Sequence, residues 1–137
     1  MKTPITVTTT VNAPVAKTWD CFTNPEHITQ WNFASSDWCC PHAVNDLVPG
    51  GKLLWRMEAK DGTIGFDLKA TYQRIIPQQE LHYTLEDGRQ VRVLFTETQG
   101  RTQVTETFEP ENQNPPEMQQ EGWQAILENF KQHVEKQ

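Results

Sequence analysis

The sequence has 137 residues, a length that fits one domain with a substantial buried core. Its 12 basic and 18 acidic residues give a net charge of -6, and no run of Lys or Arg occurs, so nucleic acids and anionic membranes are not predicted partners. No apolar stretch approaches the length of a membrane span, and nothing near the N-terminus is typical of a signal peptide. Because the three cysteines are an odd number, we expect reduced thiols and a soluble, cytoplasmic protein.

The N-terminal part of the chain predicts one strand followed by two short helices. Residues 5–11 alternate apolar and Thr side chains, which is the period of a strand with one buried face. Pro14 ends this strand and suits the start of a helix. Asn24 and Pro25 are typical of a helix cap and a first helical position, so a second short helix is predicted over residues 25–31.

The middle of the chain predicts an antiparallel meander. After a loop, a short strand is expected around residues 43–47. Asp61-Gly62 is typical of a hairpin turn, and a slip in the apolar alternation near Arg74 predicts a β-bulge. The remaining strands of the meander are predicted at residues 52–59, 64–76, 81–85, 91–95 and 102–109.

The C-terminal stretch, residues 114–134, predicts one long amphipathic helix. Asn114 suits the cap and Pro115 suits the first helical position. Gly122 inside this helix costs roughly 1 kcal/mol relative to alanine, so it indicates close packing or a small opening beside Trp123. The residues that recur on one face are Trp123, Leu127, Phe130 and Val134.

This order of elements predicts an α+β protein. About six or seven antiparallel strands form a sheet that must bury one face, and the long C-terminal helix is the available cover. A strongly curved sheet that wraps around a helix leaves a wedge between the two, and such wedges are natural ligand sites.

Several local motifs occur along the chain in an order that is known from one superfamily. They are Val11-Asn12-Ala13-Pro14, Asn24-Pro25-Glu26-His27-Ile28, Pro49-Gly50-Gly51-Lys52, Asp61-Gly62-Thr63, Thr71-Tyr72 and Gly122-Trp123. In these motifs the chain resembles the START-like, helix-grip (SRPBCC) superfamily, and within it the bacterial relatives of the activator of heat-shock protein 90 ATPase. The resemblance covers nearly the whole chain. It implies a single helix-grip domain over residues 1–137, with a cavity between the sheet and the long helix.

The resemblance leaves the function open, because this superfamily includes lipid carriers, hormone and metabolite binders and polyketide cyclases. By strand and helix periodicity, ten side chains are predicted to surround the cavity with an apolar, largely aromatic wall. Alternatively, the same side chains pack as an ordinary core. They are Trp31, Trp55, Met57, Phe66, Tyr72, Tyr83, Phe95, Trp123, Leu127 and Phe130.

One acidic residue falls on the apolar side of a predicted strand. Glu106 alternates with Val104 and Phe108, so its carboxyl group would either have a raised pKa or need a partner such as Arg92 or His82. The simpler expectation is that Glu106 lies at a margin of the sheet and reaches water.

Metal and cofactor sites are not predicted. Cys39 and Cys40 are adjacent, so they lack the spacing of the usual zinc motifs, and no second cysteine pair occurs. Cys21 is expected to be a small core residue. No motif ties a Ser or Cys nucleophile to a histidine, and no glycine-rich phosphate loop is present.

Three functional hypotheses follow. The first is a protein that binds a small, largely apolar or amphipathic molecule in the cavity. The second is a co-chaperone-like or other protein-binding module, which predicts an exposed apolar patch near Phe33 and Trp38. The third is an enzyme of cyclase or hydrolase type that uses a buried acid such as Glu106.

Overall fold

The computed structural model describes residues 3–137, which form a seven-stranded antiparallel sheet and three helices. The strands are β1 (Ile5–Val11), β2 (Trp38–Asn45), β3 (Lys52–Ala59), β4 (Gly65–Ile76), β5 (Glu80–Leu85), β6 (Gln90–Thr98) and β7 (Arg101–Phe108). The helices are α1 (Val15–Thr23), α2 (Pro25–Trp31) and α3 (Pro116–Glu135). The predicted α+β class and the two short helices after the first strand are confirmed.

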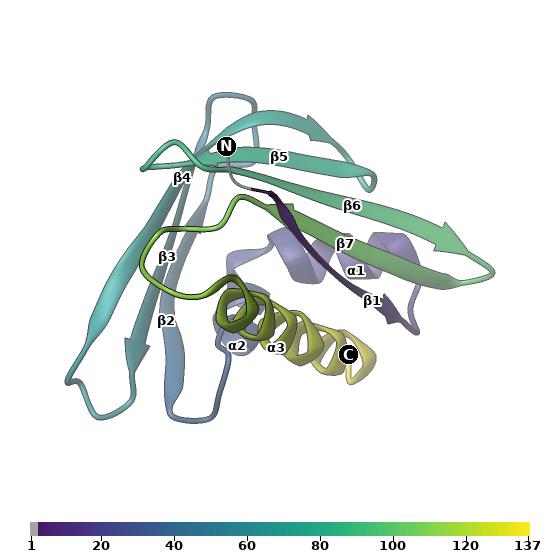
Figure 1. Ribbon diagram of the computed structural model, residues 1–137. Coiled ribbons are helices and arrows are strands. Elements are labelled where there is room, and N and C mark those ends of the chain that lie inside the picture. Colours follow the sequence, from purple (N-terminus) through teal and green to yellow (C-terminus); the bar gives the residue numbers. More distant parts are fainter. Residues whose placement is uncertain (1–2) are drawn as a thin grey trace.

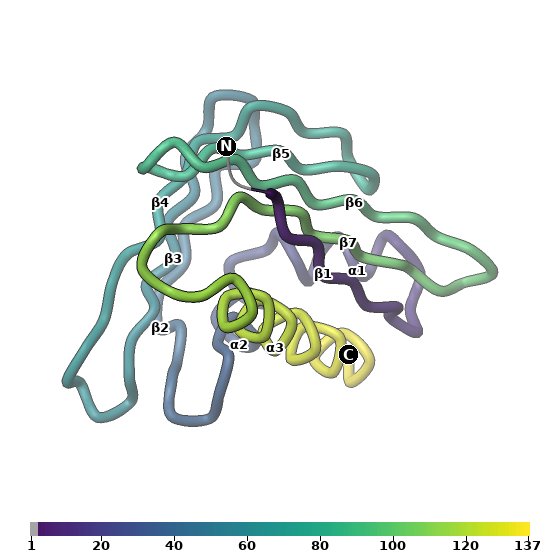
Figure 2. Tube along the Cα trace, in the orientation of Figure 1, coloured from purple at the N-terminus to yellow at the C-terminus, as the bar shows by residue number. Residues whose placement is uncertain are grey.

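The sheet is a meander that closes with its first strand. Its strand order is β1-β7-β6-β5-β4-β3-β2, so β2 to β7 follow one another and β1 pairs with β7. Figure 1 shows the sheet curled around α3, which lies in its hollow. Figure 2 follows the chain from β7 through the loop of residues 109–115 to α3. The helix-grip arrangement that the sequence predicts is therefore confirmed.

The hollow is packed with aromatic side chains between the helices and the sheet. The Phe22 ring on α1 lies at the centre of this cluster. Its centroid lies 5.4 Å from that of Trp31, 5.5 Å from that of Phe95 and 5.2 Å from that of Phe130. The cluster joins one strand to all three helices, which fixes where α3 lies relative to the sheet.

The local signals at the start of α2 and in β4 are confirmed. The Asn24 side-chain oxygen accepts a hydrogen bond from the Glu26 backbone N–H at 3.0 Å, which caps α2. The pairing register of β4 with β5 shifts between Tyr72 and Arg74, where the bulge was predicted. The strand predicted at residues 43–47 covers Trp38–Asn45 in the structure, with a register shift between Cys39 and His42.

The predicted cap of α3 is wrong. The helix begins at Pro116, and Pro115 occupies the cap position without a side-chain hydrogen bond. The Glu111 carboxylate instead accepts a hydrogen bond of 2.6 Å from the Asn114 backbone N–H, and the Gln119 side chain donates to the Asn114 carbonyl at 2.8 Å. These bonds hold the loop before the helix. No helix within residues 3–137 is long and apolar enough to cross a membrane.

Candidate functional site

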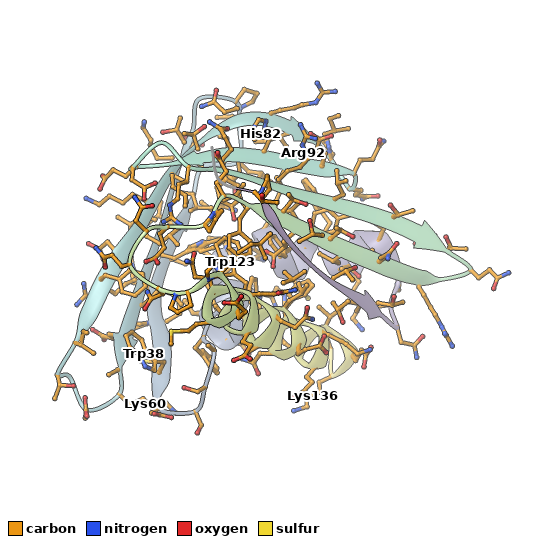
Figure 3. The ribbon with its side chains drawn as sticks, in the orientation of Figure 1. Trp38, Lys60, His82, Arg92, Trp123 and Lys136 are labelled. Atoms are coloured by element: carbon orange, nitrogen blue, oxygen red, sulfur yellow. The ribbon has the colours of Figure 1, made fainter. Side chains whose placement is uncertain are left out.

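A cavity of about 150 Å³ lies between α3 and the inner face of the sheet. Figure 3 shows Trp123 on α3 facing the sheet at this position. The side chains around the cavity come from α2, β3, β4, β5, β7, α3 and the residue after α2. They are Trp31, Asn32, Trp55, Met57, Phe66, Leu68, Tyr83, Glu106, Trp123 and Ile126.

The structure divides the ten predicted site residues into two groups. Phe95, Leu127 and Phe130 are buried in the core outside the lining. The Tyr72 hydroxyl donates a hydrogen bond to the Asn45 side-chain oxygen at 2.5 Å, so it is already paired. The predicted residues in the lining are Trp31, Trp55, Met57, Phe66, Tyr83 and Trp123.

Aromatic rings form the inner wall and the mouth of the cavity. Trp123 stacks on Phe108 with a centroid distance of 3.8 Å and an interplanar angle of 9°. Phe66 is 50% exposed and lies at the mouth, where its ring centroid is 6.2 Å from that of Trp38. A Cβ atom added to Gly122 would meet no atom within 4 Å, so the glycine marks open space and not close packing.

Glu106 is the acidic residue of the cavity wall. The simpler expectation, that it reaches water at a margin of the sheet, is wrong, because the residue is buried. It is 7% exposed, and burial raises the pKa of its carboxyl group from 4.5 to about 8. The partners considered from sequence lie on the outer face. Arg92 pairs with Glu80 at 3.6 Å, and His82 hydrogen-bonds Gln90 at 2.7 Å. Figure 3 shows His82 and Arg92 on this outer side.

Three further polar groups at the cavity wall have no hydrogen-bond partner among residues 3–137. The Tyr83 hydroxyl is buried, and burial together with the Glu106 carboxyl raises its pKa well above 10. The Trp55 indole N–H and the Asn32 amide nitrogen are both buried and unpaired. Asn32 lies beside the Cys40 thiol without making a hydrogen bond of good geometry. The residues that line this apolar cavity therefore include an acid and several buried donors without a hydrogen-bond partner among residues 3–137.

Periodicity did not identify every residue of the lining as part of the site. Leu68 shares a strand face with Phe66, and Ile126 flanks the apolar face of α3, so both were visible as apolar neighbours. Asn32 lies just beyond the end of α2, where no sequence signal separates an inward side chain from an ordinary loop residue. Only the path of the chain after α2 turns it toward the cavity.

Within residues 3–137, the side chains that could together ligate a metal do not include the adjacent cysteines Cys39 and Cys40. Cys40 is buried, and its thiol donates a hydrogen bond to the His42 carbonyl at 3.6 Å. Within the described part of the chain, Cys21, His27 and His133 form a group of three ligating side chains. Their separation in sequence explains why no spacing rule finds them.

The family model of the Activator of Hsp90 ATPase homolog 1-like protein matches residues 12–135. The chain belongs to this family. A comparison with curated proteins found no significant match. Membership of a family does not by itself fix the activity, which has to be argued from the residues that line the cavity.

Solved structures of similar proteins have the same fold as this chain. An AHSA1-like protein from Aeromonas hydrophila is 40% identical, with a TM-score of 0.91 over 98% of this chain and 93% of that one. A protein from Cytophaga hutchinsonii is 45% identical, with a TM-score of 0.83 over 96% of this chain and 92% of that one. A protein from Chromobacterium violaceum, at 18% identity, shares the fold with a TM-score of 0.86 over 96% of each chain.

Proposed function

We propose that this protein binds a small, largely apolar molecule that carries a hydrogen-bond acceptor, such as a carbonyl group, in the cavity beneath α3. The observation that supports the proposal is the combination of aromatic walls with buried polar groups that have no partner among residues 3–137. Each buried, unpaired polar group costs about 1–3 kcal/mol, so a molecule that pairs with these groups gains affinity.

The protonation of Glu106 indicates which polar group the ligand would carry. With a pKa of about 8, the carboxyl group is protonated at neutral pH and acts as a hydrogen-bond donor. The Tyr83 hydroxyl and the Trp55 indole N–H are donors as well. Among residues 3–137, no Lys or Arg is in the lining, so an anionic ligand would lack a counter-charge from this part of the chain. A neutral acceptor such as a ketone, aldehyde or ester carbonyl fits this set of donors.

A matched pair of probes tests the proposal. Acetophenone and ethylbenzene have nearly the same size and differ in the carbonyl oxygen, and binding of each is followed by amide shifts in nuclear magnetic resonance spectra. In a Trp55→Phe variant, which loses the indole N–H, we expect acetophenone to bind roughly fivefold more weakly, the effect of one hydrogen bond of about 1 kcal/mol. Ethylbenzene should bind the variant as it binds the unmodified protein.

The control variant is Trp19→Phe. Trp19 packs on Phe95, with ring centroids 5.1 Å apart, and does not line the cavity. Both probes should bind this variant as they bind the unmodified protein. The proposal is overturned if neither probe shifts amides around the cavity, or if benzylamine, whose cation would pair with an ionised Glu106, binds more tightly than acetophenone.

Glu106 also supports a second function, general acid catalysis on a bound carbonyl compound. A carboxyl group with a pKa of about 8 keeps its proton at neutral pH and can transfer it to a developing oxyanion. The infrared carbonyl band of a protonated carboxyl group, measured against pH in the unmodified protein and in Glu106→Gln, tests this idea. A midpoint near the ordinary value of 4.5 would remove its basis.

A chaperone remains a proposed partner because of the family to which the chain belongs. The exposed patch expected near Phe33 and Trp38 is not fully exposed, since both residues are half-buried. Phe66, whose ring lies beside Trp38, and Ile64, two residues before it, are exposed apolar residues. The ATPase rate of purified heat-shock protein 90, with and without this protein, tests the proposal, and an unchanged rate counts against it.

A further inference from the structure

The terminal turns of the three helices bring together three side chains that the cavity does not use. Cys21 lies in the last turns of α1, His27 in the first turn of α2 and His133 in the last turns of α3. The His27 Nδ1 atom is 2.9 Å from His133 Nε2. With the Cys21 sulfur included, the three ligating atoms all lie within 4.8 Å of one another. None of the three residues lines the cavity.

A carboxylate supports the other nitrogen of one of these imidazoles. The His27 Nε2 atom lies 3.5 Å from the Asp20 carboxylate. A histidine that ligates a metal through one nitrogen usually donates its second N–H to a carboxylate, a carbonyl or water, which fixes the ring and raises its basicity. Asp20 therefore stands where the outer partner of a metal-bound His27 would be.

We propose that Cys21, His27 and His133 form a binding site for Zn²⁺. One thiolate and two imidazoles suit zinc, whereas Ca²⁺ and Mg²⁺ prefer oxygen ligands. Three protein ligands leave a fourth tetrahedral position for water. Because the ligands come from α1, α2 and α3, a bound ion would join the ends of all three helices.

Only small side-chain movements separate the observed arrangement from a zinc site. Zn–N bonds of about 2.0–2.1 Å in a tetrahedron place the two nitrogens roughly 3.3 Å apart. The observed separation of 2.9 Å is slightly shorter. The sulfur must come within roughly 3.5 Å of each nitrogen, and the three ligating atoms already lie within 4.8 Å of one another. The His27 side chain is 23% exposed, so the ion reaches the site from solvent.

The protons balance when the ion binds. In the metal-free protein, the two imidazoles share one proton in their hydrogen bond. If His27 carries its proton on Nε2, toward Asp20, the shared proton belongs to His133 Nε2. Zinc takes the place of that proton, and His133 keeps a proton on Nδ1 by exchange with solvent. The Cys21 thiol releases its proton to solvent as the Zn–S bond forms.

Cobalt provides the direct test, since Co²⁺ occupies zinc sites and absorbs light. Titration of the reduced protein with Co²⁺ should produce a near-ultraviolet thiolate charge-transfer band and the visible bands of a tetrahedral ion, both saturating at one ion per chain. Added Zn²⁺ should abolish these bands by displacement. We expect Cys21→Ser to remove the charge-transfer band, and His27→Ala and His133→Ala to prevent saturable binding.

Matched controls separate this site from other thiols and histidines. Cys39→Ser and His82→Ala should bind Co²⁺ as the unmodified protein does, because these residues lie outside the group. Asp20→Asn should weaken binding roughly 10- to 100-fold while leaving the bands unchanged in position, as expected for an outer partner. Circular dichroism verifies that each variant is folded.

The outcomes decide for or against the proposal. Absence of a thiolate band, or a band that persists in Cys21→Ser, would overturn it. It would also be overturned if His27→Ala and His133→Ala, which change half-buried side chains, left the affinity unaltered. Binding that is lost in His82→Ala would identify adventitious binding at a histidine on the outer face of the sheet and would likewise exclude the site.

Discussion

At the scale of the residue, two buried polar side chains of the sheet, on β4 and β7, differ in whether they have a hydrogen-bond partner. The Tyr72 hydroxyl donates to Asn45, whose side-chain nitrogen donates to the Thr23 carbonyl at 2.6 Å, so this chain of bonds ties β4 to β2 and the end of α1. The Glu106 carboxyl group is buried without a partner among residues 3–137. The first residue stabilises the fold, whereas the second costs stability and is available to a ligand.

Replacement of Tyr72 by Phe should destabilise the protein by about 1–2 kcal/mol, because the Asn45 oxygen loses its hydrogen-bond donor. Tyr83→Phe is the matched control. The Tyr83 hydroxyl has no partner within residues 3–137, so its removal should change stability little. Urea unfolding of both variants measures the two costs. An equal cost for both variants would show that the Tyr72–Asn45 bond contributes no special stability.

Glu106 should make stability depend on pH in a defined direction. Between the ordinary pKa of 4.5 and the folded value of about 8, the folded protein binds more protons at this group than the unfolded chain does. Stability therefore falls as pH rises through this range, by up to a few kcal/mol, and the contribution is constant above it. Glu106→Gln should lose this fall.

Urea unfolding at about pH 5 and about pH 9 measures this dependence as the difference between the unmodified protein and the variant. That difference isolates Glu106 from other groups, such as Asp61, whose pKa is lowered by hydrogen bonds from Thr63. Glu121→Gln, on the exposed side of α3, is the control and should keep the dependence of the unmodified protein. The same slope in Glu106→Gln and Glu121→Gln would contradict the raised pKa.

At the scale of the element, α3 packs into the core with its C-terminal half and borders the cavity near its middle. Leu127, Phe130 and Val134 are at most 1% exposed and pack into the core. Near the start of the helix, Trp123 lies against Phe108, while Gly122 has open space beside it. The helix therefore anchors the fold with its C-terminal half and borders the cavity through Trp123 and Ile126.

Gly122→Ala should stabilise the protein by roughly 0.5–1 kcal/mol, because alanine has the better helix propensity and its Cβ meets no atom within 4 Å. Gly65→Ala is the opposite case. A Cβ there would lie 2.6 Å from an Arg56 nitrogen and 2.9 Å from Glu58 Cβ, so it should destabilise β4. Thermal unfolding of both variants checks the prediction, and destabilisation by Gly122→Ala would show that this face of α3 is packed.

At the scale of the whole molecule, Trp31 links elements that are far apart in sequence. Its indole N–H donates to the Cys21 carbonyl at 2.9 Å, and its own carbonyl accepts a bond from the Asn129 side chain at 2.8 Å. Its ring packs 4.9 Å from that of Phe130 and also lines the cavity. Trp31 therefore both connects the three helices and forms part of the cavity wall.

Trp31→Ala should lower the free energy of unfolding by about 3–5 kcal/mol, since it removes a large buried side chain and leaves the Cys21 carbonyl without its donor. Trp38→Ala removes the same volume from a half-buried position at the edge of the sheet and should cost clearly less. Urea unfolding measures both values. Equal losses would mean that Trp31 does not hold the helices together.

The sequence alone determined the order and type of the elements, because these depend on neighbours within a few residues. Alternation in the strands, the Asn24 cap and the Asp61-Gly62 turn all act locally, and the helix-grip motifs follow the same order. The predicted start of α3 is wrong because it depends on the loop before the helix. That loop is held by Glu111 and Gln119, which are several residues apart in the chain.

Which side chains meet depends on how the elements pack in three dimensions. The sheet's curl leaves Glu106 facing an apolar cavity while Arg92 and His82 lie on the outer face. It also places His27 beside His133, which is 106 positions away in the chain. Periodicity reports which face of an element a residue occupies. Partners depend on how distant faces pack against each other, and that packing is a property of the whole fold.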